Sequence, residues 1–441
     1  MRALRYVQGW ASALAAYPVA ERLEKRDIRA KWTELRAHYA LPFVQRRKIA
    51  ATRLAEMAAF AGARVPYYRD LFRAQAFEPA KLARDPRYLD DLPYLTKAVI
   101  REQGTRLLAH ALEGTRHHAM KTGGSTGQSA MIYYDQESAD YAAAVTLYAR
   151  ERTGKRKHMF EVHFASRFPD PPVAATVRRE NLKCLAMNRF NVFFDRLDDA
   201  GLEEIWRKLQ RFDAYLVHAH PSTIYALACY VRRRYGGGKA FEVFESSGEL
   251  LEPYMRAEIA NALRCRVIDR YGLAELGVVA YQTAAGAELL VFDSEAWPEN
   301  RPSEEHGGAP ELVFTGLRNR LMPLLRYRSG DLGRIEERAD GFFASALTGR
   351  IHDVIPINGT PYATHYVQDV LGRVGGIQEF QVDLRTQPPI LRIVPEPGAN
   401  TEHIGASLRR WWQAGLEVRF VGHDDLVRVG WRAKFRHVVD P

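Results

Sequence analysis

The chain is poor in cysteine and lacks any long apolar run. Its three cysteines, Cys184, Cys229 and Cys265, are scattered over 441 residues. They are too few for a disulfide framework and too far apart for a zinc site. No segment approaches the roughly 18 to 20 consecutive apolar residues that a membrane-spanning helix needs. These absences argue against a disulfide-stapled domain and a membrane span, and they favour a reducing compartment.

The common phosphate-binding signatures are also missing. Residues 121–127 read Lys-Thr-Gly-Gly-Ser-Thr-Gly, and such a stretch can cradle phosphate because glycine admits close backbone approach and hydroxyls donate hydrogen bonds. It is not a Walker loop, since Gln128 and Ser129 follow in place of Lys and Ser/Thr. The kinase motifs Val-Ala-Ile-Lys and His-Arg-Asp are absent. On its own the stretch is equally typical of a polar turn.

Charge and composition set broad limits. The 63 basic and 53 acidic residues give a net charge of +10 at pH 7, which suits anionic ligands but is common without them. Runs such as Arg232-Arg233-Arg234 are typical of a solvated helix face, so nucleic-acid binding is not expected. With 46% hydrophobic residues, the chain can bury a large core and divide into two or three domains.

Hydrophobic periodicity predicts helices first and alternating elements later. Polar residues interrupt the apolar stretch near the start, so we expect a helix there in place of a signal peptide. The pattern of residues 20–77 is helical. Strands are expected at 130–134, 159–165, 214–217, 241–245 and 265–269, and helices at 136–152, 199–211, 221–235 and 253–263. This alternation indicates parallel βαβ layers, whereas residues 287–343 read as a small β subdomain.

Three further motifs follow the Gly-rich stretch in order: Tyr-Gly-Leu-Ala-Glu at 271–275, Tyr-Arg-Ser-Gly-Asp at 327–331 and Gly-Arg-Ile-His-Asp at 349–353. The four motifs together resemble the adenylate-forming enzyme superfamily. Val-Pro-Tyr-Tyr-Arg at 65–69 and Leu-Pro-Tyr-Leu-Thr-Lys at 92–97 resemble its phenylacetate–coenzyme A ligase-like branch. The resemblance covers roughly residues 60 to 441.

The resemblance implies an α/β fold with a large N-terminal domain of parallel βαβ layers and a small β subdomain, followed by a small mobile α+β C-terminal lid. We expect residues 1–110 to form a helical N-terminal segment packed on the catalytic body. Residues 111–348 would form the adenylate-forming core, and residues 349–441 the hinge and lid. Asp353 occupies the hinge position about which the lid would rotate between half-reactions.

The implied activity is ATP-dependent activation of a carboxylic acid, expected to be aromatic, as an acyl-adenylate with release of pyrophosphate. Transfer to a thiol of coenzyme A or a carrier protein would follow, in the cytoplasm. The same branch includes adenylyltransferases that leave AMP on a phenolic cofactor or small molecule. A non-catalytic nucleotide-binding protein is a further alternative, suggested by Ala130, Ala274 and Ala433 at motif positions where relatives keep other residues. A homodimer is one open option.

The resemblance also assigns the nucleotide-binding residues. The triphosphate falls to the Gly-rich stretch, that is Thr122, Gly123, Gly124, Ser125, Thr126 and Gly127. The adenosine falls to Ser247, Gly248, Glu249, Asp269, Tyr271, Gly272 and Asp331. Asp331 would accept hydrogen bonds from the ribose hydroxyls, as an acceptor-only carboxylate can. Arg350 would approach the ribose or α-phosphate.

Glu275 and Lys434 carry the remaining chemistry. Glu275 would bind Mg²⁺, which prefers oxygen ligands and bridges phosphates; the alternative is a strand-to-helix turn with a solvent-exposed glutamate. Lys434 lies in Arg-Ala-Lys-Phe-Arg at 432–436 and would touch the developing charge at the α-phosphate. The alternative is a solvated basic tail.

The acid pocket is less readable. By resemblance it includes Tyr133, Tyr134, His218, His220, Pro221, Ser222 and Gly277. His218 and His220 make a poor zinc site because no third ligand is nearby in the sequence. A loop histidine hydrogen-bonded to the backbone, and tyrosines that simply pack in the core, are the alternatives.

Overall fold

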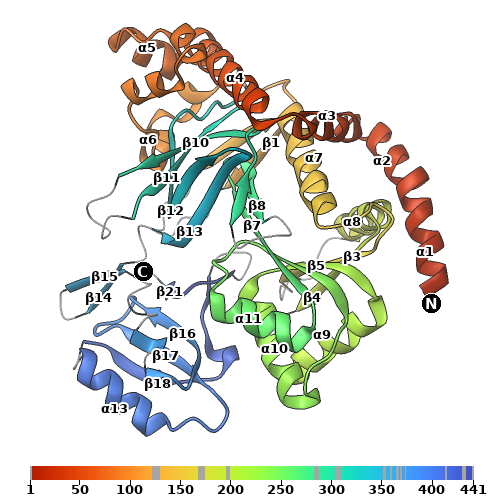
Figure 1. Cartoon of the computed structure of the whole chain (residues 1–441), viewed down its shortest axis with the longest axis vertical. Helices are drawn as coiled ribbons and strands as arrows, with labels where there is room; N and C mark the ends of the chain where they lie inside the picture. The colour runs from red at the N-terminus through yellow and green to blue at the C-terminus, as the bar shows by residue number, and fades with distance from the viewer. Residues whose placement is uncertain are drawn as a thin grey trace.

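The computed structural model of the chain describes residues 2–121, 130–166, 174–194, 199–282, 288–302, 309–350, 354–357, 360–363, 367, 370–372, 374–412, 415–429 and 434–439. Figure 1 shows N-terminal helices along one side of a long twisted sheet, further helices against the faces of that sheet, and a small C-terminal unit below it.

The N-terminal part is helical. Its elements are α1 (Arg2–Ala11), a π-helical turn (Ser12–Ala16), α2 (Tyr17–Leu23), α3 (Ile28–Ala40), α4 (Phe43–Arg64), α5 (Pro66–Ala74), 3-10 turns at Pro79–Ala83, Pro86–Asp91 and Gly104–Leu107, and α6 (Lys97–Gln103). Pro66 begins α5, a position where the missing N–H costs nothing. The Thr96 hydroxyl caps α6 by accepting a hydrogen bond from the Val99 N–H. The helical prediction for residues 20–77 is confirmed, with short breaks.

One mixed sheet organises the larger part of the molecule. Its strands lie in the order β10-β11-β12-β13-β9-β8-β7-β6-β5-β3-β4. The parallel half consists of β3 (Glu161–Ser166), β4 (Arg189–Phe194), β5 (Ala214–Ala219), β6 (Phe241–Ser246) and β7 (Arg266–Leu273). The antiparallel half consists of β8 (Gly277–Gln282), β9 (Leu289–Val291), β10 (Ala296–Arg301), β11 (Glu311–Gly316), β12 (Tyr327–Arg338) and β13 (Gly341–Arg350). A separate hairpin joins β1 (His117–Lys121) to β2 (Met131–Asp135).

Strand β7 joins the two halves, because it pairs in parallel with β6 and antiparallel with β8. The prediction of a separate small β subdomain over residues 287–343 is therefore wrong. Those strands continue the sheet to which the βαβ units belong. Sequence patterning marks strands but does not say which strand pairs with which, so the two halves looked independent.

Helices cover both faces of the parallel half. On one face, α7 (Gln136–Arg152) packs on Leu216, Val243 and Ile268. On the other, α9 (Asp199–Phe212), α10 (Pro221–Tyr235) and α11 (Pro253–Leu263) pack on the alternate residues Val162, Val217, Phe244 and Val267. The bounds of α7, α10 and α11 match those predicted. Helix α8 (Ala174–Met187) and the edge strand β4 were not predicted.

The C-terminal unit has its own sheet in the order β18-β17-β16-β21 and its own apolar core. Its elements are β14 (Val354–Ile357), β15 (Thr360–Ala363), β16 (Ile377–Asp383), β17 (Ile390–Pro395), α13 (Thr401–Trp412), β18 (Glu417–Phe420), a 3-10 turn (His423–Asp425), β19 (Arg428–Val429), β20 (Lys434–Phe435) and β21 (Val438–Val439). It contacts the larger part where Tyr254 OH donates to Glu379 Oε1 at 3.4 Å. A cavity of about 290 Å³ beside Cys229 and Gln378 lies along the same boundary.

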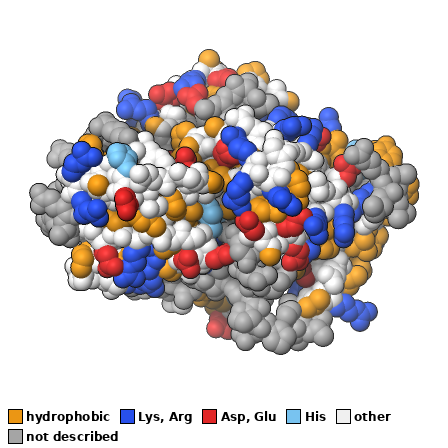
Figure 2. All heavy atoms as spheres, turned by 90° about the horizontal axis from the view of Figure 1, so that it is seen from below, with side chains coloured by type: hydrophobic (Ala, Val, Ile, Leu, Met, Phe, Trp, Pro, Cys, Tyr) orange, Lys and Arg blue, Asp and Glu red, His pale blue; other side chains and the backbone are white. Residues whose placement is uncertain are grey.

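No helix within the described residues is both long enough and apolar enough to cross a membrane. On the face shown in Figure 2, basic and acidic side chains are intermixed with apolar ones.

Candidate active site

The motif at 271–275 lies in a β-hairpin. Tyr271, Gly272 and Leu273 complete β7, and Gly277 begins β8 after a tight turn. Gly277 has φ of +76°, a conformation that favours glycine. A Cβ on Gly272 would lie 3.1 Å from the Gly277 carbonyl oxygen, so this position also requires close backbone approach. The alternative of a strand-to-helix turn is wrong.

Glu275, at the tip of this hairpin, is a buried carboxylate, only 4% exposed. Tyr327 OH donates to its Oε1 at 2.5 Å, and Lys97 Nζ lies 3.7 Å from the same atom. Burial, assisted by the Glu275 charge, raises the pKa of the neighbouring Tyr134 phenol. The alternative of a solvent-exposed Glu275 is therefore wrong, and a buried carboxylate of this kind fits an oxygen ligand for a divalent cation.

Asp331 lies on β12, which does not pair with β7, and its carboxylate meets β7 through the Tyr271 side chain. Tyr271 OH donates to Asp331 Oδ2 at 2.8 Å, and the Asp331 N–H donates to Ser329 Oγ at 3.0 Å. The antiparallel pairing of β12 with β13 sets Asp331 opposite Arg350. Three residues from three separate motifs are thus brought together by one sheet, although the Arg350 side chain lies outside the described part.

The loops that follow β5 and β6 are hydrogen-bonded to each other. The Ser247 N–H donates to the Ala219 carbonyl at 3.2 Å, and His220 Nδ1 lies 2.9 Å from the Ser247 carbonyl oxygen. The Ser222 N–H donates to Glu249 Oε2 at 3.3 Å. Gly248 between them has φ of +86°. Carboxyl ends of parallel strands are where open α/β sheets bind ligands. The contact of His220 with the Ser247 carbonyl is the backbone hydrogen bond of a loop histidine, which was the alternative to a role in the acid pocket.

His218 belongs to a buried polar cluster. Its Nδ1 lies 2.7 Å from Glu245 Oε2, and burial lowers the pKa of the His218 imidazole. Although burial alone would raise it, the charge of Arg150 and the contact with His218 hold the pKa of Glu245 well below its usual range. Within the described residues, no group of three His, Cys, Asp or Glu side chains is placed to hold a metal ion.

The other predicted pocket and nucleotide residues have mixed settings. The Tyr133 carbonyl accepts a hydrogen bond from Asn319 Nδ2 at 2.8 Å. The side chains of Tyr133 and Tyr134 pack on the large apolar core. Pro221 is the first residue of α10. Asp269 faces away from α7, and burial raises its pKa to about 6.

Several predicted residues are outside the described part. They are the phosphate stretch Thr122 to Gly127 and the hinge residue Asp353. Lys434 belongs to β20, where its backbone pairs with Val429 of β19, but its side chain is not among those described. The assignments of these residues stay predictions.

Three contact residues were missed as site residues. Lys97 and Tyr327 stand in motifs used for the resemblance, yet their meeting at Glu275 depends on tertiary structure. Arg270 precedes Tyr271 directly, and its Nη1 donates to Ser247 Oγ at 2.7 Å. An arginine next to a nucleotide motif was the available signal.

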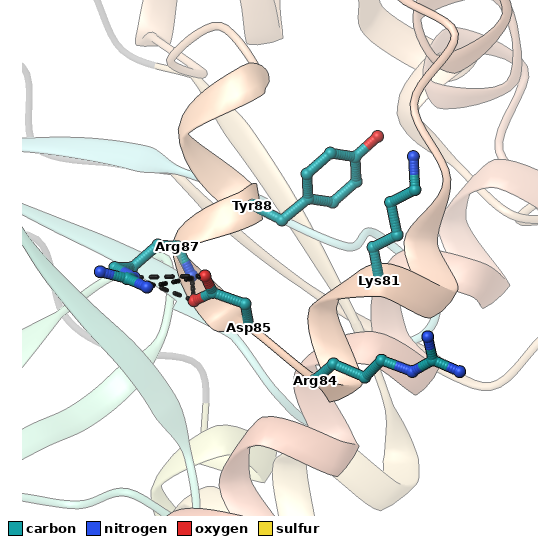
Figure 3. Close-up of a pocket in the computed structure, with 5 residues that line it drawn as sticks. All are labelled: Lys81, Arg84, Asp85, Arg87 and Tyr88. Carbon is teal, nitrogen blue, oxygen red and sulfur yellow. Dashed lines mark hydrogen bonds and ion pairs between the residues drawn. The ribbon is translucent and has the colours of Figure 1, made fainter.

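A surface hollow of about 560 Å³ lies elsewhere, among the 3-10 turns of the N-terminal part. Figure 3 shows its lining residues, with Arg87 turned away from Tyr88 and Lys81 to pair with Asp85 at 3.0 Å. It contains none of the predicted site residues, so we do not assign it a role.

Comparison with known proteins agrees with this fold. No family model matches the chain. It is 27% identical to a phenylacetate–coenzyme A ligase of Escherichia coli (strain K12) over 352 residues, 75% of this chain and 71% of that protein. It is 25% identical to protein CapK of Staphylococcus aureus over 252 residues, 56% of this chain and 54% of CapK. The match to CapK thus spans about half of that protein.

Among solved structures, a 2-hydroxyisobutyryl-CoA ligase in the postadenylation state aligns with a TM-score of 0.67 at 18% identity, covering 91% of this chain and 90% of that one. The fold is that of an adenylate-forming ligase. The chain is a member of the adenylate-forming superfamily and a distant homologue of phenylacetate–coenzyme A ligases and CapK.

Proposed function

We propose that this protein activates a carboxylic acid with ATP as an acyl-adenylate, releases pyrophosphate, and transfers the acyl group to a thiol. The observation that carries the proposal is the hairpin geometry of β7 and β8. It holds Tyr271 against Asp331 and, a few residues on, Glu275 against Tyr327 and Lys97. One hairpin thereby carries Glu275 and contacts Asp331, so two carboxylates from two of the four motifs meet it.

Each carboxylate has a task suited to its setting. Asp331, oriented by the Tyr271 hydroxyl, accepts hydrogen bonds from the ribose. Glu275 would hold Mg²⁺, which when bound neutralises phosphate charge. The Tyr327 hydroxyl fixes the Glu275 carboxylate, and the Lys97 ammonium adds a positive charge beside that carboxylate.

Residues outside the described part complete the proposal. Thr122 to Gly127 would hold the β- and γ-phosphates, and Arg350 would approach the α-phosphate from the end of β13. The C-terminal unit, residues 349–441, would act as a lid that turns about Asp353 and delivers Lys434. The independent core of that unit supports motion as one body.

The acceptor thiol is proposed to be that of coenzyme A. The names of the phenylacetate–coenzyme A and 2-hydroxyisobutyryl-CoA ligases support this choice, and a carrier-protein thiol is the second candidate. An aromatic acid is the first substrate class to test, because the sequence relatives include several phenylacetate–coenzyme A ligases.

The test is pyrophosphate release over a panel of aromatic, aliphatic and amino acids, followed by detection of the coenzyme A thioester. We expect acid-dependent pyrophosphate release, and we expect Glu275→Gln to require more Mg²⁺. Pyrophosphate release with AMP left on a phenol and no thioester would favour the adenylyltransferase alternative. ATP binding without pyrophosphate release for any acid would favour the non-catalytic one.

A further inference from the structure

A row of polar side chains lies on the α7-facing side of the parallel half. The strand registers set His163 of β3 beside His218 of β5, and His218 beside Glu245 of β6. Arg150 of α7 covers this row and donates to Glu245 Oε2 at 2.6 Å. Such a buried polar layer is costly unless it is paired or binds a ligand.

The charges in this layer do not balance. Glu161 pairs with Lys155 at 2.8 Å and with Arg150 at 3.2 Å, and Glu245 pairs with Arg150. Burial lowers the pKa of His163 to about 3 and also lowers that of His218, so neither imidazole adds charge at neutral pH. Two carboxylates thus face three cations, Arg150, Lys155 and Arg270, because the Glu245 charge also acts on Arg270. One positive charge is in excess.

Arg270 lies on the same face, one step further toward the ligand-binding edge of the sheet. Strand β6 ends at Ser246, whereas β7 continues to Leu273. Arg270 therefore stands level with Ser247, just beyond the end of β6, and its Nη1 donates to the Ser247 hydroxyl. His218 and His220, which the resemblance assigns to the acid pocket, lie at the end of the nearby strand β5.

The Arg270 guanidinium retains hydrogen-bonding capacity. Its Nε is buried and donates to no group within the described residues. No carboxylate of the described residues lies within ion-pair distance of it, and burial lowers its pKa. Because Nη1 is held by Ser247, the edge formed by Nε and Nη2 is the one that could receive a ligand. That edge matches a carboxylate in a two-point contact.

We propose that Arg270 is a specificity residue that selects acids carrying a second carboxylate, which the Nε edge of its guanidinium binds. The inference rests on the proposed function, since it names the substrate class of the same site. The reacting carboxylate points to the nucleotide, while the second carboxylate reaches the polar layer beside α7.

The test compares matched acids that differ by one carboxylate, phenylacetate with 4-carboxyphenylacetate and hexanoate with adipate. We expect the wild-type kcat/KM for pyrophosphate release to favour the dicarboxylic member by roughly 10 to 150-fold, the effect of one charged hydrogen-bonded contact. Arg270→Met should lower kcat/KM for the dicarboxylic acids far more than for their partners. Arg270→Lys should lie between, since a point charge cannot make the two-point contact.

Arg207→Met on α9 is the matched control, because its side chain is 68% exposed. This control variant should keep the wild-type kcat/KM for the monocarboxylic and the dicarboxylic member of each pair. A wild-type preference for the monocarboxylic acids would overturn the proposal. So would an equal loss for both members of each pair, since Arg270 would then act on the shared carboxylate or the nucleotide.

A second measurement separates this inference from the proposed function. If no acid releases pyrophosphate, the proposed function fails, and calorimetric titration of adipate and hexanoate in the absence of ATP decides the role of Arg270. Adipate binding that is lost in Arg270→Met supports a dicarboxylate site. Equal binding of adipate to wild type and variant, or no binding to either, overturns it.

Discussion

The ammonium group of Lys97 lies 3.7 Å from Glu275 Oε1, although the two residues belong to motifs far apart in the sequence. Lys97 is the first residue of α6, where the Thr96 cap fixes the start of the helix. Glu275 is held by the β7–β8 hairpin and by Tyr327. A helix start and a hairpin tip thus meet at one buried carboxylate.

We expect Lys97→Met to slow pyrophosphate release by about 10²–10³-fold, the usual effect of removing one preorganised charge at a developing anion. Lys97→Arg should recover part of the activity because it keeps the positive charge. Steady-state kinetics of both variants, with thermal unfolding to show that they are folded, check this prediction. Wild-type kinetics for Lys97→Met would mean that the ion pair is only structural.

Asp331→Ala should weaken ATP binding, because two hydrogen bonds to a charged acceptor are worth roughly 1.5–3 kcal/mol each. Tyr271→Phe is the matched variant: it removes the hydroxyl that orients Asp331 but keeps the carboxylate, so its loss should be smaller. Titration calorimetry with ATP measures both. Unchanged affinity in Asp331→Ala would remove the ribose assignment.

The contribution of Glu379 to the free energy of unfolding should fall as the pH rises. Burial raises the pKa of Glu379, His437 opposes this shift, and the charge of Glu249 adds a smaller increase, so that the net pKa is about 7. A carboxyl whose pKa is raised on folding contributes stability below its unfolded pKa, near 4.5, and loses that contribution as the pH rises through about 7. The change is on the order of 2–3 kcal/mol.

Glu379→Gln removes the charge and keeps the shape, so its stability should fall less than that of the wild type between pH 5 and pH 8. Chemical denaturation at both pH values measures the difference. The exposed Glu417 on β18 provides the control, since Glu417→Gln should follow the wild type. Parallel pH profiles for wild type and Glu379→Gln would show that Glu379 ionises normally in the folded protein.

The sequence predicted the helices of the parallel half well because their signals are local. Asp135 caps α7, and Pro221 and Pro253 mark the starts of α10 and α11. The single mixed sheet was not predicted. It depends on β7 pairing in parallel with β6 on one side and antiparallel with β8 on the other. Pairing of this kind is not local and leaves no periodic signal.

The site shows the same division. Short motifs select Asp331, Tyr271 and Glu275, and the roles of these residues stay predictions. The structure adds the contact of Tyr271 with Asp331 and that of Tyr327 with Glu275. The meeting of Lys97 with Glu275, and the position of Arg270 level with Ser247, depend on strand register and helix placement. Neither can be deduced from a motif alone.

The resemblance places Lys434 at the α-phosphate during adenylation only. Its strand β20 pairs with β19, and β19 begins at Arg428, whose Nη1 lies 3.5 Å from Ser222 Oγ of the larger part. The segment that carries Lys434 is therefore tied to the boundary between the two parts. Lys434→Ala should slow acyl-adenylate formation by about 10²–10³-fold and affect thioester formation from a preformed acyl-adenylate far less.

Lys434→Arg should substitute poorly, because a planar guanidinium does not replace a compact ammonium. ATP affinity should barely change, since Asp331 belongs to the larger part. Pyrophosphate exchange reports the first half-reaction, and transfer from a synthetic acyl-adenylate to coenzyme A reports the second. A residue that acts in only one half-reaction should slow that half-reaction alone. Equal loss in both half-reactions, or no loss in either, would therefore assign the C-terminal basic run to the solvated surface.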